Sequence, residues 1–345
     1  MPMTSSHHTL LVTGGAGFIG SAFVRQAVAA GQRVIVLDVL TYAGHRINLE
    51  GVDVNLHTLV VGDIADGTLV AKLLRDHAID AVAHFAAESH VDNSISKPSA
   101  FIDTNIVGTY RLLEAAREYW NALAPDKKDS FRFLQVSTDE VYGSLGPKGA
   151  FSETTAMKPN SPYSASKAAG DHLARAWHKT YGLPVLVTNC SNNYGPRQHP
   201  EKLIPHMITR ALSGESLPVY GDGKNIRDWI HVEDHCAGVA LALAKGVPGE
   251  TYCFGGQAEF TNIDLVTIIC KTLDKLKPRN RGGSYESQIA FVKDRLGHDK
   301  RYAIDDTKAK RELGFKRRHN FESGLRATVE WYLANGEWCK VRKAA

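Results

Sequence analysis

The first 190 residues alternate between short runs of β-branched and apolar residues and longer amphipathic segments. Five of the short runs predict strands, at residues 10–12, 33–37, 80–85, 131–136 and 183–188. Strands that alternate with helices are typical of a parallel sheet with helices on both faces. The pattern therefore predicts an α/β fold, a doubly wound parallel sheet, for residues 1–190.

After residue 190 the pattern changes to shorter strands and more frequent turns, such as Gly221-Asp222-Gly223. Helical periodicity returns near residues 232–244, 262–274 and 321–334. Short strands, turns and a few helices favour a smaller α/β unit. We expect residues 191–345 to form mostly a substrate-binding region that caps the sheet.

Composition limits the class of protein. The chain of 345 residues is 43% hydrophobic and 23% charged, enough for a sizeable core in one large domain or two. Its net charge of +4 is spread out, and the basic cluster Lys316-Arg317-Arg318 is more typical of a solvated turn than of a nucleic-acid site. No apolar run approaches the ~20 residues that span a bilayer, and the polar residues 1–8 lack the apolar stretch of a signal peptide. We expect a cytoplasmic protein without nucleic-acid or membrane partners.

The cysteines indicate the redox environment. The chain has 5 cysteines, which lie far apart and form no Cys-x-x-Cys pair. A disulfide framework or a zinc site normally needs an even or closely spaced set. We therefore predict no disulfide framework and no metal site, which fits a reducing cytoplasm.

A glycine-rich turn, Thr13-Gly14-Gly15-Ala16-Gly17-Phe18-Ile19-Gly20, follows the first predicted strand directly. Glycines at this spacing allow a tight turn, a close approach of backbone to a pyrophosphate and close packing of helix on sheet. A glycine triplet alone is a weak signal, but here a strand precedes it and a helix follows. The turn predicts a dinucleotide site on a Rossmann fold.

Acidic residues after later strands refine this site. Asp38 ends the second predicted strand, where a carboxylate can hydrogen-bond the adenosine ribose and repel the 2′-phosphate of NADP. NAD is therefore the expected cofactor. Asp63 and Ile64 follow a further strand and could border the adenine, although an aspartate there is often only a helix cap.

Tyr163 and Lys167 are one helical turn apart, shortly after a plausible helix start at Ser161-Pro162. A free tyrosine has a pKa near ~10 and is a poor base at neutral pH. A nearby ammonium and an oxidised nicotinamide would lower that pKa. Tyr163 could then accept a hydroxyl proton while a hydride leaves for NAD. Tyr-x-x-x-Lys is also common on plain helix surfaces, so its place after a nucleotide turn matters.

These residues, together with Asn105 on a central helix, resemble the extended short-chain dehydrogenases over nearly the whole chain. Longer motifs resemble the dTDP-glucose 4,6-dehydratase family of nucleotide-sugar dehydratases. They are Ala86-Ala87-Glu88-Ser89-His90-Val91-Asp92, Ser137-Thr138-Asp139-Glu140-Val141-Tyr142-Gly143, Thr188-Asn189-Cys190-Ser191-Asn192-Asn193-Tyr194-Gly195-Pro196, Ile226-Arg227-Asp228-Trp229 and Gly297-His298-Asp299.

The resemblance implies a lyase reaction on dTDP-glucose in three steps. NAD oxidises C4, water leaves across C5 and C6, and the hydride returns to C6, giving a 4-keto-6-deoxy sugar for deoxysugars such as rhamnose. Adjacent carboxyls just past a strand end can have different pKa values and divide acid and base roles. By resemblance, Glu140 takes the C5 proton, protonated Asp139 gives its proton to the C6 hydroxyl, and Thr138 hydrogen-bonds the C4 oxygen.

The resemblance also implies two sets of binding residues and a homodimer, which would pair through helices at residues 104–120 and 163–181. The cofactor residues are Gly14, Gly17, Phe18, Ile19, Gly20, Asp38, Leu40, Thr41, Asp63, Ile64, Ala86, Ala87, Ser89, Thr104, Tyr163, Lys167 and Asn193. The substrate residues are Ser89, Thr138, Asn192, Lys202, Leu203, Pro218, Val219, Tyr220, Arg227, Asn262, Asp294 and His298. Leu203 and Pro218 are equally explained as packing residues.

Two departures from the family pattern leave the nucleotide base open between thymine and uracil. Arg197-Gln198-His199 stands where the family usually has Tyr-His-Phe, and Leu296 replaces a usual proline. UDP-glucose is therefore an alternative substrate. Nucleotide-sugar 4-epimerases and decarboxylases lack the paired acids, which also makes GDP-mannose or CDP-glucose dehydratases less fitting. A non-catalytic NAD-sensing protein would tend to lose the tyrosine or the lysine.

Overall fold

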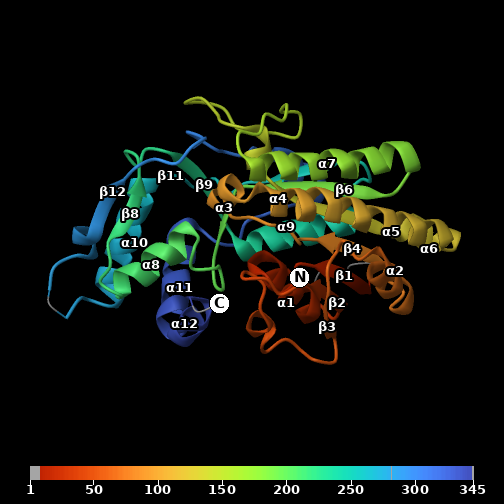
Figure 1. Ribbon diagram of the computed structural model, residues 1–345, viewed down its shortest axis with the longest axis horizontal. Helices are drawn as coiled ribbons and strands as arrows, with labels where there is room; N and C mark the ends of the chain where they lie inside the picture. Colours follow the sequence, from red (N-terminus) through yellow and green to blue (C-terminus); the bar gives the residue numbers. More distant parts are fainter. Residues whose placement is uncertain (1–7, 281, 344–345) are drawn as a thin grey trace.

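A seven-stranded parallel sheet forms the larger part of the molecule (Figure 1). The computed structural model describes residues 8–280 and 282–343, so most of the polar start lies outside the described part. The order across the sheet is β10 (Thr251–Phe254), β6 (Val185–Cys190), β5 (Arg132–Thr138), β4 (Ala81–His84), β1 (Thr9–Thr13), β2 (Arg33–Asp38) and β3 (His57–Val61). All neighbouring pairs are parallel, which confirms the predicted doubly wound fold.

Helices cover both faces of this sheet, which explains why its strands are apolar throughout. On β1, Leu10 and Val12 belong to one core cluster, whereas Leu11 belongs to the cluster on the opposite face. Alternate residues of a strand point to opposite faces, so a sheet buried on both sides needs continuous apolar runs. One face is covered by α1 (Phe18–Ala29) and α9 (Val232–Lys245), the other by α2 (Gly67–Asp76), α5 (Thr109–Ala122) and α7 (Pro162–Tyr181).

A second lobe lies at the other end of the molecule in Figure 1 and has a core of its own. Its strands form a three-stranded and a two-stranded sheet. They are β7 (Asn192–Tyr194), β8 (Leu217–Tyr220), β9 (Ile226–His231), β11 (Glu259–Thr261) and β12 (Ile289–Val292). Its helices are α8 (Leu203–Leu212), α10 (Asn262–Leu276), η4 (Tyr285–Gln288), α11 (Phe321–Ala334) and α12 (Gly336–Lys343).

The two lobes are not simply consecutive in the chain. Both α9 and β10 come after residue 190, yet α9 packs on the large sheet and β10 extends it beside β6. The boundary at residue 190 stays a prediction, and these are two elements on its far side that pack with the sheet. The short connecting elements are η1 (Arg46–Leu49), α3 (Val91–Ser96), α4 (Pro98–Ile102), η2 (Asp103–Gly108), α6 (Pro125–Ser130), η3 (Asp139–Tyr142) and η5 (Ala309–Leu313).

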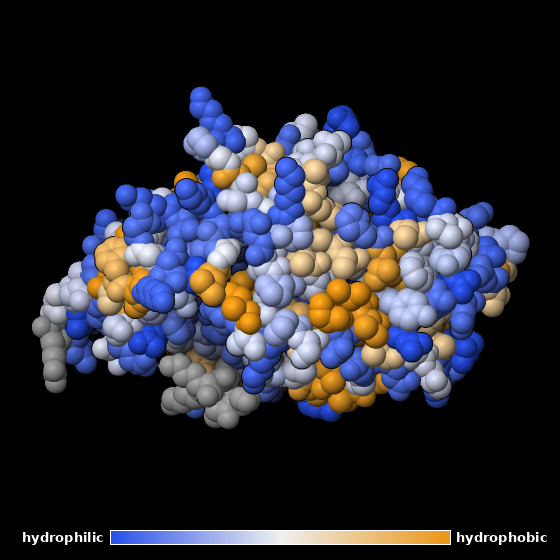
Figure 2. All heavy atoms as spheres, turned by 45° about the horizontal axis from the view of Figure 1, so that its top comes forward, coloured by the Kyte–Doolittle hydropathy of each residue, from blue (hydrophilic) through white to orange (hydrophobic). Residues whose placement is uncertain are grey.

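The surface of the larger lobe is partly apolar. Figure 2 shows apolar side chains gathered on the half of the molecule that carries α5 and α7. The exposed apolar residues on α3, α4, η2, α5 and α7 are Ile95, Ile102, Val107, Tyr110 and Tyr181. Within residues 8–280 and 282–343, no helix combines the length and apolarity that crossing a membrane requires.

Candidate functional site

A cavity of about 680 Å³ lies at the carboxyl ends of the parallel strands and continues between the sheet and the second lobe. In a doubly wound sheet this edge is where ligands bind, and the volume suits a small-molecule site. The residues predicted to touch cofactor or substrate line this cavity, apart from Leu40, Asp139 and Asp294. The structure thus brings together residues that are up to 284 positions apart, from Gly14 to His298.

The glycine turn shapes the cofactor end of the cavity. Gly14 has a left-handed φ of +68°, and a Cβ there would lie 2.5 Å from the Ala86 nitrogen. A Cβ on Gly20 would lie 2.2 Å from the Gly14 oxygen. Gly17 begins α1 without a side-chain cap, so the first backbone N–H groups of this helix are available to an anion. These are the features that a bound dinucleotide pyrophosphate requires.

Asp38 fixes the wall beside this turn. Its carboxylate accepts hydrogen bonds from the backbone N–H of Ala16 at 2.9 Å and of Leu40 at 2.8 Å. Leu40 itself points away from the cavity lining and holds a left-handed φ of 56°. A carboxylate oxygen has two lone pairs, so an aspartate in this place is suited to a ribose hydroxyl.

Asp63 and Ile64 also line the cavity, but their contacts differ. The exposed Asp63 accepts a hydrogen bond from the Ala65 N–H at 2.8 Å, which closes a local turn. Ile64 is 4% exposed and packs close to Gly108, where a Cβ would lie 2.8 Å from its Cδ1. Asp63 therefore closes a local turn and also lines the cavity.

Helix α7 presents Tyr163 and Lys167 to the cavity. The helix starts with a capping box between Ser161 and Ser164, with proline in its first turn, a combination that stabilises a helix start. Lys167 is buried, and its Nζ donates to the Val136 carbonyl oxygen at 2.7 Å. The lysine is thereby held against β5 next to the tyrosine.

The pKa of Tyr163 lies well above its usual value, because the hydroxyl is buried and the negative charge of Glu140 is close. A hydrogen bond to Thr138 acts in the opposite direction. Tyr163 therefore holds its proton more tightly than a free tyrosine, and the phenolate that could accept a substrate proton is disfavoured in the protein alone. Lys167 is already in place beside it, so the lower pKa expected from the sequence stays an expectation for the protein with the cationic cofactor bound.

Asn105, which was named only as part of the family resemblance, holds the neighbouring segment in place. Its Nδ2 donates to the Ser166 Oγ at 2.9 Å and to the Glu88 carbonyl at 3.0 Å, and its Oδ1 accepts from the Glu88 N–H at 2.9 Å. Asn105 lies in η2, a turn of π-helix, a geometry that recurs at functional sites. It ties α7 to the segment that follows β4.

The two adjacent acids occupy different environments at the end of β5. Glu140 lines the cavity, whereas Asp139 is 1% exposed and its Oδ2 has no hydrogen-bond partner among the described residues. Burial and the charges of Glu140 and Asp228 raise the pKa of Asp139 well above its usual value. The protonated form of Asp139 is therefore favoured relative to that of a free aspartate.

Glu140 is also buried, which raises its pKa, but three cations oppose that effect. They are Arg295, Arg227 and Lys202, in decreasing order of influence. Arg227 acts on both carboxyls, whereas Arg295 and Lys202 act on Glu140. This asymmetry is the condition under which neighbouring acids divide the tasks of proton donor and proton acceptor.

Basic groups gather at the substrate end of the cavity. Arg227 is 5% exposed, donates to the Asp299 carbonyl at 3.0 Å and stacks over the Tyr302 ring at 4.1 Å. Lys202 donates to the Ser89 carbonyl at 2.7 Å. Buried guanidinium and ammonium groups suit the phosphates of a nucleotide sugar.

The polar residues at the substrate end differ in whether their hydrogen-bonding groups already have partners in the protein. The Asn192 Oδ1 is buried without a hydrogen-bond partner among the described residues, so it can serve a ligand. Asn193 is occupied inside the protein, because its Oδ1 meets His235 Nδ1 at 3.0 Å. Asp294 lies outside the lining but meets His298 Nδ1 at 2.7 Å. It therefore acts on the cavity through the histidine.

The two departures from the family pattern fall in different places. Gln198 and His199 line the cavity, whereas Arg197 turns outward to place its guanidinium 5.3 Å from the Trp331 ring centroid. Leu296 is 77% exposed. Of these four residues, Gln198 and His199 are the ones placed to affect a bound nucleotide.

Several cavity residues were not anticipated. Arg295 is the most consequential, because its charge acts on Glu140, and its only signal was its place beside Asp294. Others lie within or next to the quoted motifs but carry no chemical signature of their own. The unanticipated polar members are Glu88, His90, Asp92, Ser137, Cys190, Ser191, Glu201, His206, Trp229 and Arg295.

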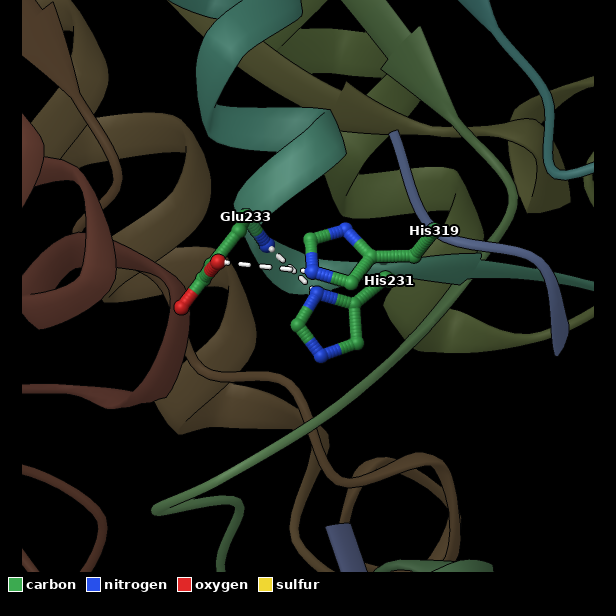
Figure 3. A group of neighbouring side chains, drawn as sticks. All are labelled: His231, Glu233 and His319. Carbon is green, nitrogen blue, oxygen red and sulfur yellow. Dashed lines mark hydrogen bonds and ion pairs between the residues drawn. The ribbon is translucent and has the colours of Figure 1, made fainter. Parts of the chain in front are cut away.

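A separate cluster of His231, Glu233 and His319 lies where the C-terminal segment meets the start of α9 (Figure 3). Their potential ligand atoms lie within 4.8 Å of one another. The two histidine rings are stacked with centroids 3.9 Å apart, and His231 Nδ1 accepts the Glu233 N–H at 3.3 Å. Stacked rings direct their lone pairs side by side rather than toward one point, which favours a hydrogen-bonded cluster that anchors the C-terminal segment. The prediction of no metal site stays a prediction.

Comparison with known proteins agrees with this geometry. A family model described as GDP-mannose 4,6 dehydratase matches residues 11–328. The chain is 61% identical over 331 residues to a dTDP-glucose 4,6-dehydratase of Xanthomonas campestris pv. campestris, covering 96% of this chain and 94% of that protein. It is 55% identical over 340 residues to dTDP-glucose 4,6-dehydratase 1 of Escherichia coli K12, covering 95% and 94%.

A solved structure shows the same arrangement. The dTDP-glucose 4,6-dehydratase DesIV of Streptomyces venezuelae, solved with NAD and dTDP bound, superimposes with a TM-score of 0.89 at 49% identity, covering 97% of this chain and 99% of that one. These similarities confirm the resemblance carried by the motifs. The chain therefore belongs to the nucleotide-sugar 4,6-dehydratase family, as a relative of the dTDP-glucose 4,6-dehydratases.

Proposed function

We propose that this protein is an NAD-dependent hydro-lyase that converts dTDP-glucose into dTDP-4-keto-6-deoxyglucose. The observation that carries the proposal is the pair Asp139 and Glu140 at the end of β5: Glu140 lines the same cavity as Tyr163 and Lys167, and the buried Asp139 is its neighbour in the chain. Tyrosine and lysine alone support alcohol oxidation. The paired acids add the means to remove water from the oxidised sugar.

The first task of the protein is to remove the C4 hydroxyl proton. Tyr163 accepts this proton, Thr138 donates a hydrogen bond to the C4 oxygen, and the Lys167 ammonium stabilises the phenolate. Bound NAD would supply the acceptor for the C4 hydride and the donor of the hydride that C6 receives. Asp38 favours NAD over NADP, because a carboxylate at the end of this strand would repel the 2′-phosphate of NADP.

The second task is the elimination. Once C4 is a ketone, the C5 hydrogen is acidic, and Glu140 takes it as a proton. Asp139 gives its proton to the C6 hydroxyl, which leaves as water, so the two carboxyls exchange protonation states. Arg227, Arg295 and Lys202 favour the ionised form of Glu140, and burial favours the protonated form of Asp139.

The test is an incubation of purified protein with dTDP-, UDP- and CDP-glucose, read by the alkaline absorbance of a 4-keto-6-deoxy product. We expect product from all of the added dTDP-glucose and slower or no reaction with the other two. A faster rate with UDP-glucose than with dTDP-glucose would show that the nucleotide pocket prefers uracil to thymine. It would not contradict the dehydratase chemistry. Absence of product from every nucleotide sugar would refute the proposal.

We further propose a homodimer that covers the exposed apolar face of α4, η2 and α5. Ile102, Val107 and Tyr110 are 45%, 42% and 37% exposed, so they are not core residues of a monomer. An apolar face of this kind is typical of protein contacts. Light scattering should give twice the monomer mass for the wild type, and Val107→Glu should shift it toward the monomer; a monomeric wild type would exclude the dimer.

The cytoplasm is the proposed location. None of the 5 cysteines forms a disulfide, and all are buried. Free thiols persist in reducing compartments. Localisation of a tagged protein by cell fractionation tests this, and recovery from an oxidising compartment would contradict it.

A further inference from the structure

Helix α7 continues the spacing of the catalytic pair by one more turn. Asp171 follows Lys167 by four residues, as Lys167 follows Tyr163, so the three side chains lie along one side of the helix. Asp171 is 2% exposed and does not line the cavity. Burying a carboxylate that has no compensating partner costs free energy. Neither step of the proposed mechanism uses Asp171.

The surroundings of Asp171 are polar and belong to the site. Its Oδ2 accepts from Asn189 Nδ2 at 3.3 Å, and the same amide group donates to the Thr138 carbonyl at 3.0 Å. Gln135 and Ser137 on β5 also interact with the carboxylate. Asp171 is thereby connected to the strand that ends in Thr138 and Asp139.

We propose that Asp171 is a positioning residue: one helical turn beyond Lys167 on α7, its carboxylate keeps that side chain protonated in its buried place and so allows Lys167 to stabilise the Tyr163 phenolate. The proposal deepens the proposed function and rests on it. No contact between Asp171 and substrate or cofactor is part of it.

Electrostatics agree with this role. Burial lowers the pKa of Lys167, and Asp171 is the strongest influence that raises it again. Burial raises the pKa of Asp171 to about 6, with Lys167 first among the opposing causes. Asp171 is therefore ionised at pH 7, when the lysine needs a counter-charge.

The other titratable groups near this pair are not suited to replace it. On β4, burial lowers the pKa of His84 to about 3, so this ring is neutral. Burial raises the pKa of the Cys190 thiol on β6 and of the Tyr142 hydroxyl on η3, so both are neutral at pH 7. Asp171 is the ionised acid among the described groups that act directly on Lys167.

The kinetic test uses Asp171→Asn with dTDP-6-deoxyglucose. This substrate has no C6 hydroxyl to lose, so the reaction stops after C4 oxidation and NADH accumulates. We expect the alkaline limb of the rate profile, where Lys167 loses its proton, to move about 1 to 3 pH units lower. Asp171→Glu should restore part of the shift.

Asp306→Asn is the matched control. Asp306 is equally buried but pairs with Arg317 and Lys310, away from the cavity lining. Its replacement should leave the pH profile in place. A folded, NAD-binding Asp171→Asn enzyme with the wild-type profile would overturn the proposal, even at a lower rate.

A second measurement does not depend on activity. Lys167→Met leaves Asp171 buried without its counter-charge, so the thermal midpoint at pH 8 should fall and should recover in Lys167→Met/Asp171→Asn. No recovery would show that the two residues are not coupled and would overturn the proposal. If wild-type protein failed to dehydrate any sugar, the proposed function would fall while this coupling remained measurable.

Discussion

The two ends of the cavity are built by different means. At the cofactor end, backbone groups of one turn, from Gly14 to Gly20, and the uncapped start of α1 shape the site. At the substrate end, side chains from separate elements converge: Lys202 before α8, Arg227 on β9, and Arg295 in the segment after β12. One end depends on local geometry and the other on long-range packing. Substitutions should therefore separate cofactor binding, substrate binding and chemistry.

The largest effect is expected between the two ends, at Glu140→Gln. Because the amide cannot accept the C5 proton, elimination should slow by about 10²- to 10⁴-fold while C4 oxidation continues. Hydrogen–deuterium exchange at C5, followed by NMR, measures this directly. Exchange at the wild-type rate would remove Glu140 as the base.

Asp38→Asn tests the cofactor end alone. The amide can accept from Ala16 or Leu40 but places an NH₂ group against the other, so the turn and the ribose contact are weakened. We expect NAD binding to weaken by about 10- to 100-fold, the worth of a hydrogen bond to a charged group, with dTDP binding unchanged. Titration calorimetry with each ligand checks both; an equal loss of dTDP binding would show that the ends are not independent.

Arg227→Met tests the substrate end alone. Loss of the guanidinium should weaken dTDP binding by about 10- to 100-fold, and NAD content should stay at the wild-type level. The long apolar methionine retains part of the packing on Tyr302. If NAD were lost as well, Arg227 would be a folding residue rather than a phosphate ligand.

Asp139→Asn should lower the activity and raise the stability of the folded protein. Since folding raises the pKa of Asp139, the folded state binds a proton that the unfolded state releases above pH ~4. This costs about 1.4 kcal/mol for each pH unit between the unfolded and folded pKa values. The variant should unfold at a higher temperature than wild type at pH 7, with no advantage at pH 3, and should not eliminate water. Equal midpoints at both pH values would contradict the pKa assignment.

The smallest effect is expected at His319→Gln, in the cluster outside the cavity. Asp234 raises the pKa of His319, so its stabilising contribution is complete below pH ~6.5 and is lost as the pH rises through the folded pKa. The side chain is 28% exposed, so we expect a loss below about 1 kcal/mol at pH 6 and less at pH 9. Thermal unfolding at the two pH values measures it, and a larger loss at pH 9 would reverse the interpretation.

The same contrast explains what could be predicted from the sequence. The glycine turn, Asp38 and the Tyr163–Lys167 pair could be predicted from the sequence. Each depends on one strand, turn or helix, whose geometry follows from residues close together in the chain. The seven-stranded sheet was only partly predictable, since β10 joins it from beyond residue 190 through pairing with β6. Arg295 carries no local signature, because its effect on Glu140 exists only after packing. Asp171 stands at helical spacing from Lys167, but the sequence does not show that both side chains are buried together.

The central claim is that oxidation, elimination and reduction occur on one sugar within one turnover. dTDP-glucose labelled with deuterium at C4 tests it most directly, with mass spectrometry and NMR of the product. We predict a 4-keto-6-deoxy product that carries the deuterium at C6 and a solvent-derived hydrogen at C5. Return of the deuterium to C4, as in an epimerase, or its absence from C6 would contradict the account.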